Sequence, residues 1–160
     1  MINIYIASPL GFTESTRSFM DTLEDMIASC GYTVHNPWRM TDPELFRLAA
    51  AIQDTSQRWQ ALRQANSQTA ATNEQAIRDC DRVVAVLDGP DVDSGTASEI
   101  GFAYAVGKRI YGYRGDSRLT GDNEAAVVNL QVEYWIENSG GCILRDLDSL
   151  QRLLGKAIKE

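Results

Sequence analysis

The sequence predicts an α/β sandwich built on a mostly parallel, five-stranded sheet. Short apolar segments with strand character alternate along the chain with longer amphipathic segments. The most apolar of them, residues 83–87, reads Val-Val-Ala-Val-Leu, which is typical of a strand buried on both faces. A chain of 160 residues with 44% hydrophobic residues is large enough for a substantial core, and we expect residues 1–160 to form a single domain.

The predicted elements follow one another without an internal repeat. Strands are predicted at 3–7, 32–34, 83–87, 109–113 and 140–144. Helices are predicted at 13–30, 96–107, 125–136 and 146–158, from apolar residues spaced three and four apart. Between 43 and 81 the apolar periodicity is patchy and predicts separate helical segments near 45–49, 57–66 and 73–80. Residues 35–38 and the polar stretch 114–124 are predicted as loops, the latter a candidate lid.

Composition excludes several classes of partner. The formal net charge of −7 disfavours attraction to nucleic acid phosphates or to anionic membranes, and no apolar run reaches membrane-spanning length. The three cysteines (Cys30, Cys80 and Cys142) are far apart, and the single histidine, His35, has no neighbouring metal ligand in the sequence. Because the chain opens directly on a strand-like segment, we expect a cytoplasmic protein. We also expect it to use neither a metal nor an organic cofactor.

An acidic turn follows the most apolar strand and leads into a helix. Asp88, Asp91 and Asp93 fall within six positions, and Ser94-Gly95-Thr96 opens the helix that carries Glu99. Ligands of parallel sheets bind beyond the carboxyl ends of the strands, which is where this turn is predicted to lie. Glu99 is expected in the first turn or so, where peptide N–H groups and the helix dipole favour an ionised carboxylate. Such a group can act as a nucleophile, although a glutamate in a first helical turn is also common without any catalytic role.

Three segments resemble the nucleoside 2-deoxyribosyltransferase family. They are residues 4–12 (IYIASPLGF), 88–103 (DGPDVDSGTASEIGFA) and 128–132 (VNLQV). The resemblance implies a flavodoxin-like, three-layer fold and an enzyme that exchanges the base of 2′-deoxynucleosides for another free purine or pyrimidine base. It also implies a covalent deoxyribosyl–enzyme intermediate, and retaining glycosidases use the same logic of two carboxyl groups.

The resemblance implies a role for each matched residue. Glu99 would be the nucleophile, Tyr5 would hold its carboxylate, and Asp93 would help to protonate the leaving base. Asn73, where some members carry an aspartate, would bind and orient the base. Asn129 would reach the sugar of a neighbouring subunit, so that a homo-oligomer shares its active sites. The remaining substrate-binding residues that we expect are Asp88, Phe12, Gly11 and Gln131, the last of which replaces a methionine of some members.

Two alternatives stay open. A 2′-deoxynucleoside 5′-monophosphate N-glycosidase would share the fold and the glutamate but transfer the sugar to water. Its phosphate pocket would need hydroxyl and arginine side chains, which the segment with Thr13, Ser15, Thr16 and Arg17 contains. A flavin-binding electron carrier could hold its phosphate at the same helix start, but it would leave Asp93 and Glu99 without a role.

Overall fold

A parallel sheet forms the centre of the molecule. The computed structural model describes residues 2–158. Within this range five strands form one sheet in the order β2-β1-β3-β4-β5, and every neighbouring pair is parallel. The strands are β1 (Asn3–Ala7), β2 (Thr33–His35), β3 (Arg82–Val86), β4 (Arg109–Tyr113) and β5 (Ile143–Leu144). The predicted α/β fold with five strands is confirmed, and the sheet is parallel throughout.

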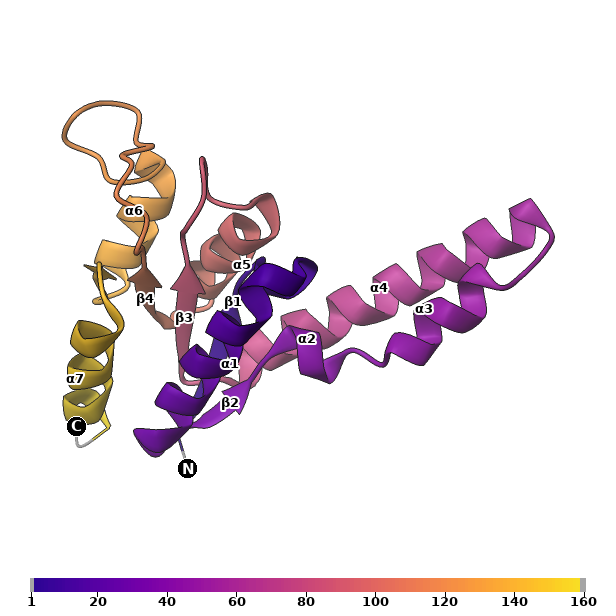
Figure 1. Cartoon of the computed structure of the whole chain (residues 1–160), viewed down its shortest axis with the longest axis horizontal. Helices are drawn as coiled ribbons and strands as arrows, with labels where there is room; N and C mark the ends of the chain where they lie inside the picture. The colour runs from indigo at the N-terminus through magenta and orange to yellow at the C-terminus, as the bar shows by residue number, and fades with distance from the viewer. Residues whose placement is uncertain (1, 159–160) are drawn as a thin grey trace.

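Helices cover both faces of this sheet, which makes three layers (Figure 1). Helices α1 (Glu14–Ser29) and α7 (Leu147–Ala157) pack against each other and against one face. Helices α5 (Ser94–Ala105) and α6 (Leu130–Asn138) pack on the opposite face, together with the end of α4 (Thr55–Asp79). The central strands β1, β3 and β4 are therefore buried on both sides, as the apolar run of β3 predicted.

The alternation of side chains along β1 decides which residues face the α5 layer. Ile4 and Ile6 point into the core beneath α1 and α7, whereas Tyr5 and Ala7 point into the core beneath α5. Successive side chains of a strand alternate between its faces, so this division follows directly from the strand geometry. Tyr5 pairs in register with Val83 of β3, which places it in the middle of the sheet.

The crossover from β2 to β3 differs from its prediction. Helix α2 (Pro37–Met40) occupies the predicted loop, because Asn36 accepts a hydrogen bond from the Trp38 amide and a proline stands at the first helical position. The separate segments predicted after residue 57 are one continuous helix, α4, of 25 residues. Figure 1 shows α4 and its partner α3 (Pro43–Ala50) projecting beyond the edge of the sheet. Because much of α4 faces solvent, with Trp59 63% exposed, its apolar periodicity is weak.

The second difference lies after β4. The helix predicted from residue 125 begins only at Leu130, where Asn129 accepts hydrogen bonds from the amides of Gln131 and Val132. Residues 114–129 therefore form one long connection without a helix. None of the helices formed by residues 2–158 combines the length and apolar character that a membrane crossing requires.

Candidate active site

A cavity of about 660 Å³ opens at the carboxyl ends of β1 and β3. Its walls come from four parts of the chain that are distant in sequence. The loop after β1 and the short helix η1 (Leu10–Phe12) form one wall, and α2 and α3 form the next. The second half of α4 and the first two turns of α5 complete it. Parallel sheets bind ligands at this edge, so the cavity lies where the acidic turn predicted a site.

Glu99 lines the cavity, and Tyr5 contacts it from the sheet. The Tyr5 hydroxyl donates a hydrogen bond of 2.6 Å to Oε1 of Glu99, and the Tyr5 side chain is fully buried. Burial, together with the nearby Glu99 carboxylate, raises the pKa of Tyr5 far above its ordinary value. Tyr5 therefore remains a hydrogen-bond donor at every physiological pH. The two residues lie 94 positions apart in the sequence, and only the packing of α5 on β1 brings them together.

The expectation that Glu99 lies in the first helical turn is wrong. Helix α5 begins at Ser94, which makes Glu99 its sixth residue, and no acidic side chain lies in the first turn. The free peptide N–H groups of the helix start do not reach the second turn, so they do not favour its ionised form. Burial raises the pKa of Glu99 to about 7, the hydrogen bond from Tyr5 opposes this rise, and the charge of Asp93 adds to it.

Asp93 joins the start of α5 to the cavity. Its Oδ2 accepts hydrogen bonds from the amide of Thr96 at 3.0 Å and from the Thr96 hydroxyl at 3.4 Å, so Asp93 is the N-cap of the helix. Asp93 also lines the cavity beside Glu99. A Cβ atom at Gly95 would lie 3.0 Å from Asp93 Oδ2, a close contact with the capping carboxylate. The sequence alone did not single out Gly95.

Aromatic side chains form the opposite wall. Phe12 and Trp38 contact each other edge to face with their ring centroids 4.4 Å apart, and both line the cavity. The Trp38 indole donates a hydrogen bond of 2.9 Å to the carbonyl of Ser8, which fixes the orientation of the ring. Gly11 does not itself line the cavity, but a Cβ atom there would lie 2.0 Å from the Trp38 ring. Gly11 thus allows Trp38 to pack against the loop.

Asn73 presents an amide from α4 to the same cavity. Its Oδ1 is buried and has no hydrogen-bond partner within residues 2–158. A buried acceptor without a partner is costly, and a ligand N–H group would satisfy it. This unpaired atom is consistent with the predicted contact between Asn73 and a base.

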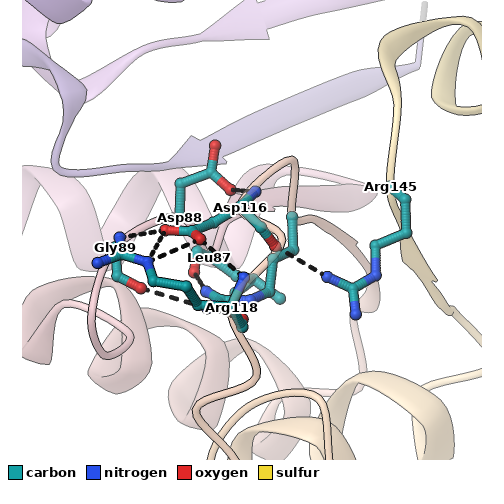
Figure 2. Close-up of polar contacts among 7 residues, drawn as sticks. Leu87, Asp88, Gly89, Asp116, Arg118 and Arg145 are labelled. Atoms are coloured by element: carbon teal, nitrogen blue, oxygen red, sulfur yellow. Dashed lines mark hydrogen bonds and ion pairs between the residues drawn. The ribbon is translucent and has the colours of Figure 1, made fainter.

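Three other predicted substrate-binding residues do not line this cavity within a single chain. Asp88 accepts a hydrogen bond of 2.9 Å from the amide of Asp116, and Figure 2 shows that contact among a group of charged side chains. Asn129 and Gln131 lie at the start of α6, where the Asn129 side chain caps the helix. Of the predicted site residues, the cavity is therefore lined by Phe12, Asn73, Asp93 and Glu99. Tyr5 joins them through its hydrogen bond to Glu99.

The cavity wall carries no lysine or arginine side chain among the described residues, and its charged members are Asp93 and Glu99. No group of three histidine, cysteine or carboxylate side chains in residues 2–158 is arranged to hold a metal ion. The arrangement consists of a buried tyrosine–glutamate pair, a second carboxylate and aromatic walls. It can bind a flat, uncharged ring and place a carboxylate against the atom attached to it.

Comparison with known proteins identifies the family and the fold of this chain. A model of the family described as nucleoside 2-deoxyribosyltransferase matches residues 4–131. No curated protein sequence matches the chain.

Three solved structures share the fold. A conserved protein from Enterococcus faecalis V583 is 23% identical with a TM-score of 0.72, and the match covers 98% of this chain and 99% of that one. A 2-desoxiribosyltransferase from Leishmania mexicana is 19% identical with a TM-score of 0.67, covering 98% of both chains. The CMP N-glycosidase BcmB from Clostridium botulinum is 20% identical with a TM-score of 0.54, covering 95% of this chain and 96% of that one. Since the family model spans most of the sequence, the chain belongs to the nucleoside 2-deoxyribosyltransferase family.

Proposed function

We propose that this protein is a nucleoside 2-deoxyribosyltransferase that exchanges the base of 2′-deoxynucleosides through a covalent deoxyribosyl–Glu99 intermediate. The observation that carries the proposal is the hydrogen bond of 2.6 Å from the buried Tyr5 to the half-buried Glu99, which lines a cavity together with Asp93. Family membership supports a glycosyl-transfer or hydrolysis reaction on nucleosides.

In the first step, an oxygen of ionised Glu99 attacks C1′ of the deoxyribose. The bond between C1′ and the base nitrogen breaks, its electron pair goes to the base, and Asp93 supplies the proton that the base takes up. In the second step, a nitrogen of another base attacks C1′, the ester bond to Glu99 breaks, and the proton of that nitrogen returns to Asp93. Two displacements at one carbon retain its configuration. Positioned proton transfer of this kind contributes about 10²–10⁴-fold to the rate.

The walls of the cavity suit an uncharged nucleoside better than a nucleotide. A 5′-phosphate would require cationic or N–H donors, whereas the described lining contains two carboxylates and no lysine or arginine. Of the hydroxyl groups proposed for a phosphate pocket, that of Thr16 already donates to the carbonyl of Leu10 at 2.5 Å. The flat aromatic faces of Phe12 and Trp38 would contact the base, and the amide of Asn73 would orient it.

The 2′-deoxynucleoside 5′-monophosphate N-glycosidase is the second candidate. The fold shared with the CMP N-glycosidase from Clostridium botulinum favours it, because that architecture also supports hydrolysis of a nucleotide. In such an enzyme water would take the place of the second base, and the product would be a free sugar phosphate.

We also propose a homo-oligomer, in the cytoplasm, that serves nucleoside salvage. Asn129 and Gln131 lie outside the cavity of their own chain, at the start of α6. The resemblance to the family implies that Asn129 would reach the sugar bound in a neighbouring subunit, which supports this proposal. An Asn129→Ala variant would then lose transfer activity without losing the cavity of its own chain, and mixing it with a Glu99→Ala variant would restore part of the activity.

The decisive experiment uses chromatography of reaction mixtures. The protein is incubated with 2′-deoxyinosine with and without adenine, and in parallel with 2′-deoxyinosine 5′-monophosphate. We expect deoxyadenosine only when adenine is present, and none from the Glu99→Ala variant. Glu74→Ala, which removes a solvent-facing glutamate of α4, is the matched control and should keep full activity. Release of hypoxanthine from the monophosphate alone would instead establish the glycosidase.

A further inference from the structure

Arg114 is a completely buried arginine directly after β4. Its side chain has no solvent exposure, and it is the largest fully buried side chain among the described residues. One terminal nitrogen donates to the carbonyl of Leu87. The other donates to the carbonyls of Gly89 at 3.2 Å and of Arg118 at 2.8 Å. No carboxylate accepts a hydrogen bond from this guanidinium in the described structure, so its bonds go to main-chain oxygens of two loops.

These two loops lie side by side at the carboxyl edge of the sheet. Figure 2 shows Leu87, Asp88 and Gly89 of the first loop against Asp116 and Arg118 of the second. A further bond joins them in the same direction, because the Asp116 amide also donates to the loop after β3, to Asp88 Oδ1 at 2.9 Å. Arg114 itself is anchored to β5, where its amide donates to the carbonyl of Leu144 at 2.8 Å. The guanidinium thus connects the loop after β3 to the rigid end of the sheet.

The loop after β3 leads directly to the candidate active site. Gly89 adopts φ +128°, a conformation that residues with a side chain rarely adopt, so the chain turns sharply between the two carbonyls that Arg114 binds. Four residues later the loop ends at Asp93, which caps α5 and lines the cavity. The Asp93 carboxylate is therefore placed from two sides: by the Thr96 amide within α5 and by the path of the loop that Arg114 holds.

Burying a guanidinium to join two loops has a high cost in free energy. Removing a charge from water has a large cost, and a buried arginine is retained where a fixed geometry of several donors is needed. Arg114 offers that geometry to three carbonyls that would otherwise lack these partners. The position of the loop matters for catalysis, since a displacement of about 1 Å can cost roughly 10²-fold in rate.

We propose that Arg114 is a positioning residue, which holds the loop 87–93 so that Asp93 stays at the cap of α5 and against the cavity. The catalytic part of this proposal rests on the proposed function, in which Asp93 exchanges a proton with the base. The structural part does not depend on it.

The structural part is tested by amide hydrogen exchange measured by NMR. The Thr96 amide is one of the first amides of α5 and depends on Asp93 for its hydrogen bond. In α7 the Ser149 amide depends in the same way on Asp146, at 2.7 Å, and serves as the internal reference. We expect Arg114→Lys to accelerate exchange at Thr96 at least tenfold relative to Ser149. Arg82→Lys is the matched control, because Arg82 also donates to a main-chain carbonyl, that of Ala157, but from the first residue of β3 at the opposite edge of the sheet.

The catalytic part is tested by combining variants. We expect Arg114→Lys to lower kcat for base exchange 10- to 100-fold, with a change of less than threefold in KM. In an Asp93→Asn background, which keeps a capping side chain, the same substitution should lower kcat less than threefold. A merely structural arginine would lower activity equally in both backgrounds. That result, or an Arg114→Lys variant in which exchange at Thr96 is accelerated no more than exchange at Ser149, would overturn the proposal.

Arg114→Gln is the second variant, because it keeps an amide donor without a buried charge. If neither variant folds, Arg114 serves the fold as a whole rather than the position of Asp93, and the proposal fails. If the wild-type protein does not exchange bases, the proposed function fails alone, and the Thr96 measurement still decides the role of Arg114.

Discussion

Replacing Glu99 with glutamine is expected to stabilise the fold at alkaline pH while abolishing base exchange. Glutamine keeps an oxygen that can accept the hydrogen bond from Tyr5, but it removes the buried carboxylate. Burial raises the pKa of Glu99 from its ordinary value of 4.5 to about 7. The folded protein therefore binds the Glu99 proton more tightly than the unfolded chain does, and the contribution of Glu99 to stability falls as the pH rises from about 4.5 to about 7.

The size of the effect follows from this difference. At 1.36 kcal/mol for each pKa unit, the upper bound on the penalty for ionised Glu99 is about 3 kcal/mol. Glu99 is partly accessible from the cavity, so solvent screening reduces the expected value to about 2 kcal/mol. For a domain of this size, a gain of 2 kcal/mol raises Tm by about 4–8 °C.

The assay is urea unfolding followed by tryptophan fluorescence at pH 4, 7 and 9. We expect the two proteins to differ little at pH 4 and Glu99→Gln to be the more stable by about 2 kcal/mol at pH 9. Glu44→Gln is an informative control, because the hydrogen bond from Arg47 lowers the pKa of Glu44. This variant should instead become less stable relative to wild type as the pH rises. A difference between Glu99→Gln and wild type that is the same at all three pH values would refute a raised Glu99 pKa.

The remaining predictions concern the pH profile and three neighbouring residues. Because attack on C1′ requires ionised Glu99, kcat/KM for transfer should rise with pH through an apparent pKa of about 7. Tyr5→Phe removes the hydrogen bond that lowers the Glu99 pKa, so the rise should move to higher pH, and an unmoved profile would contradict that role. Asn73→Ala should raise KM for the acceptor base about 2- to 12-fold, the value of one hydrogen bond, with little change in kcat; an unchanged KM would exclude the contact. Gly11→Ala should lower stability by about 1–3 kcal/mol in urea unfolding, because its Cβ would overlap the Trp38 ring, and wild-type stability would disprove that packing.

The local patterns of the sequence were sufficient for the sheet and the helices against it. The run from Val83 to Val86 is apolar at every position because a parallel strand is covered on both faces, and that property is independent of distant residues. The same holds for α1, whose apolar stripe faces one core, and for Gly31, whose φ of +95° ends that helix region. The apolar patterns did not predict the structure where a helix extends beyond the core. Helix α4 buries only part of its length, so its periodicity did not indicate one continuous helix.

Some features of the candidate site could likewise be predicted from local sequence patterns, and others could not. The residue types of the site were readable from the sequence, because a carboxylate-rich turn after a buried strand and a glutamate in the next helix are local features. The ionisation state of these residues was not readable from the sequence. Whether Glu99 is ionised depends on how much water the packing of α5 against β1 leaves around it, and on a tyrosine 94 positions away. Likewise, the burial of Arg114 arises only when distant loops meet. The same is true of the cavity wall, whose described residues include no lysine. The sequence by itself determined which groups are available for the reaction, and the tertiary structure decided their solvation and their neighbours, because burial and Coulomb interactions act through space rather than along the chain.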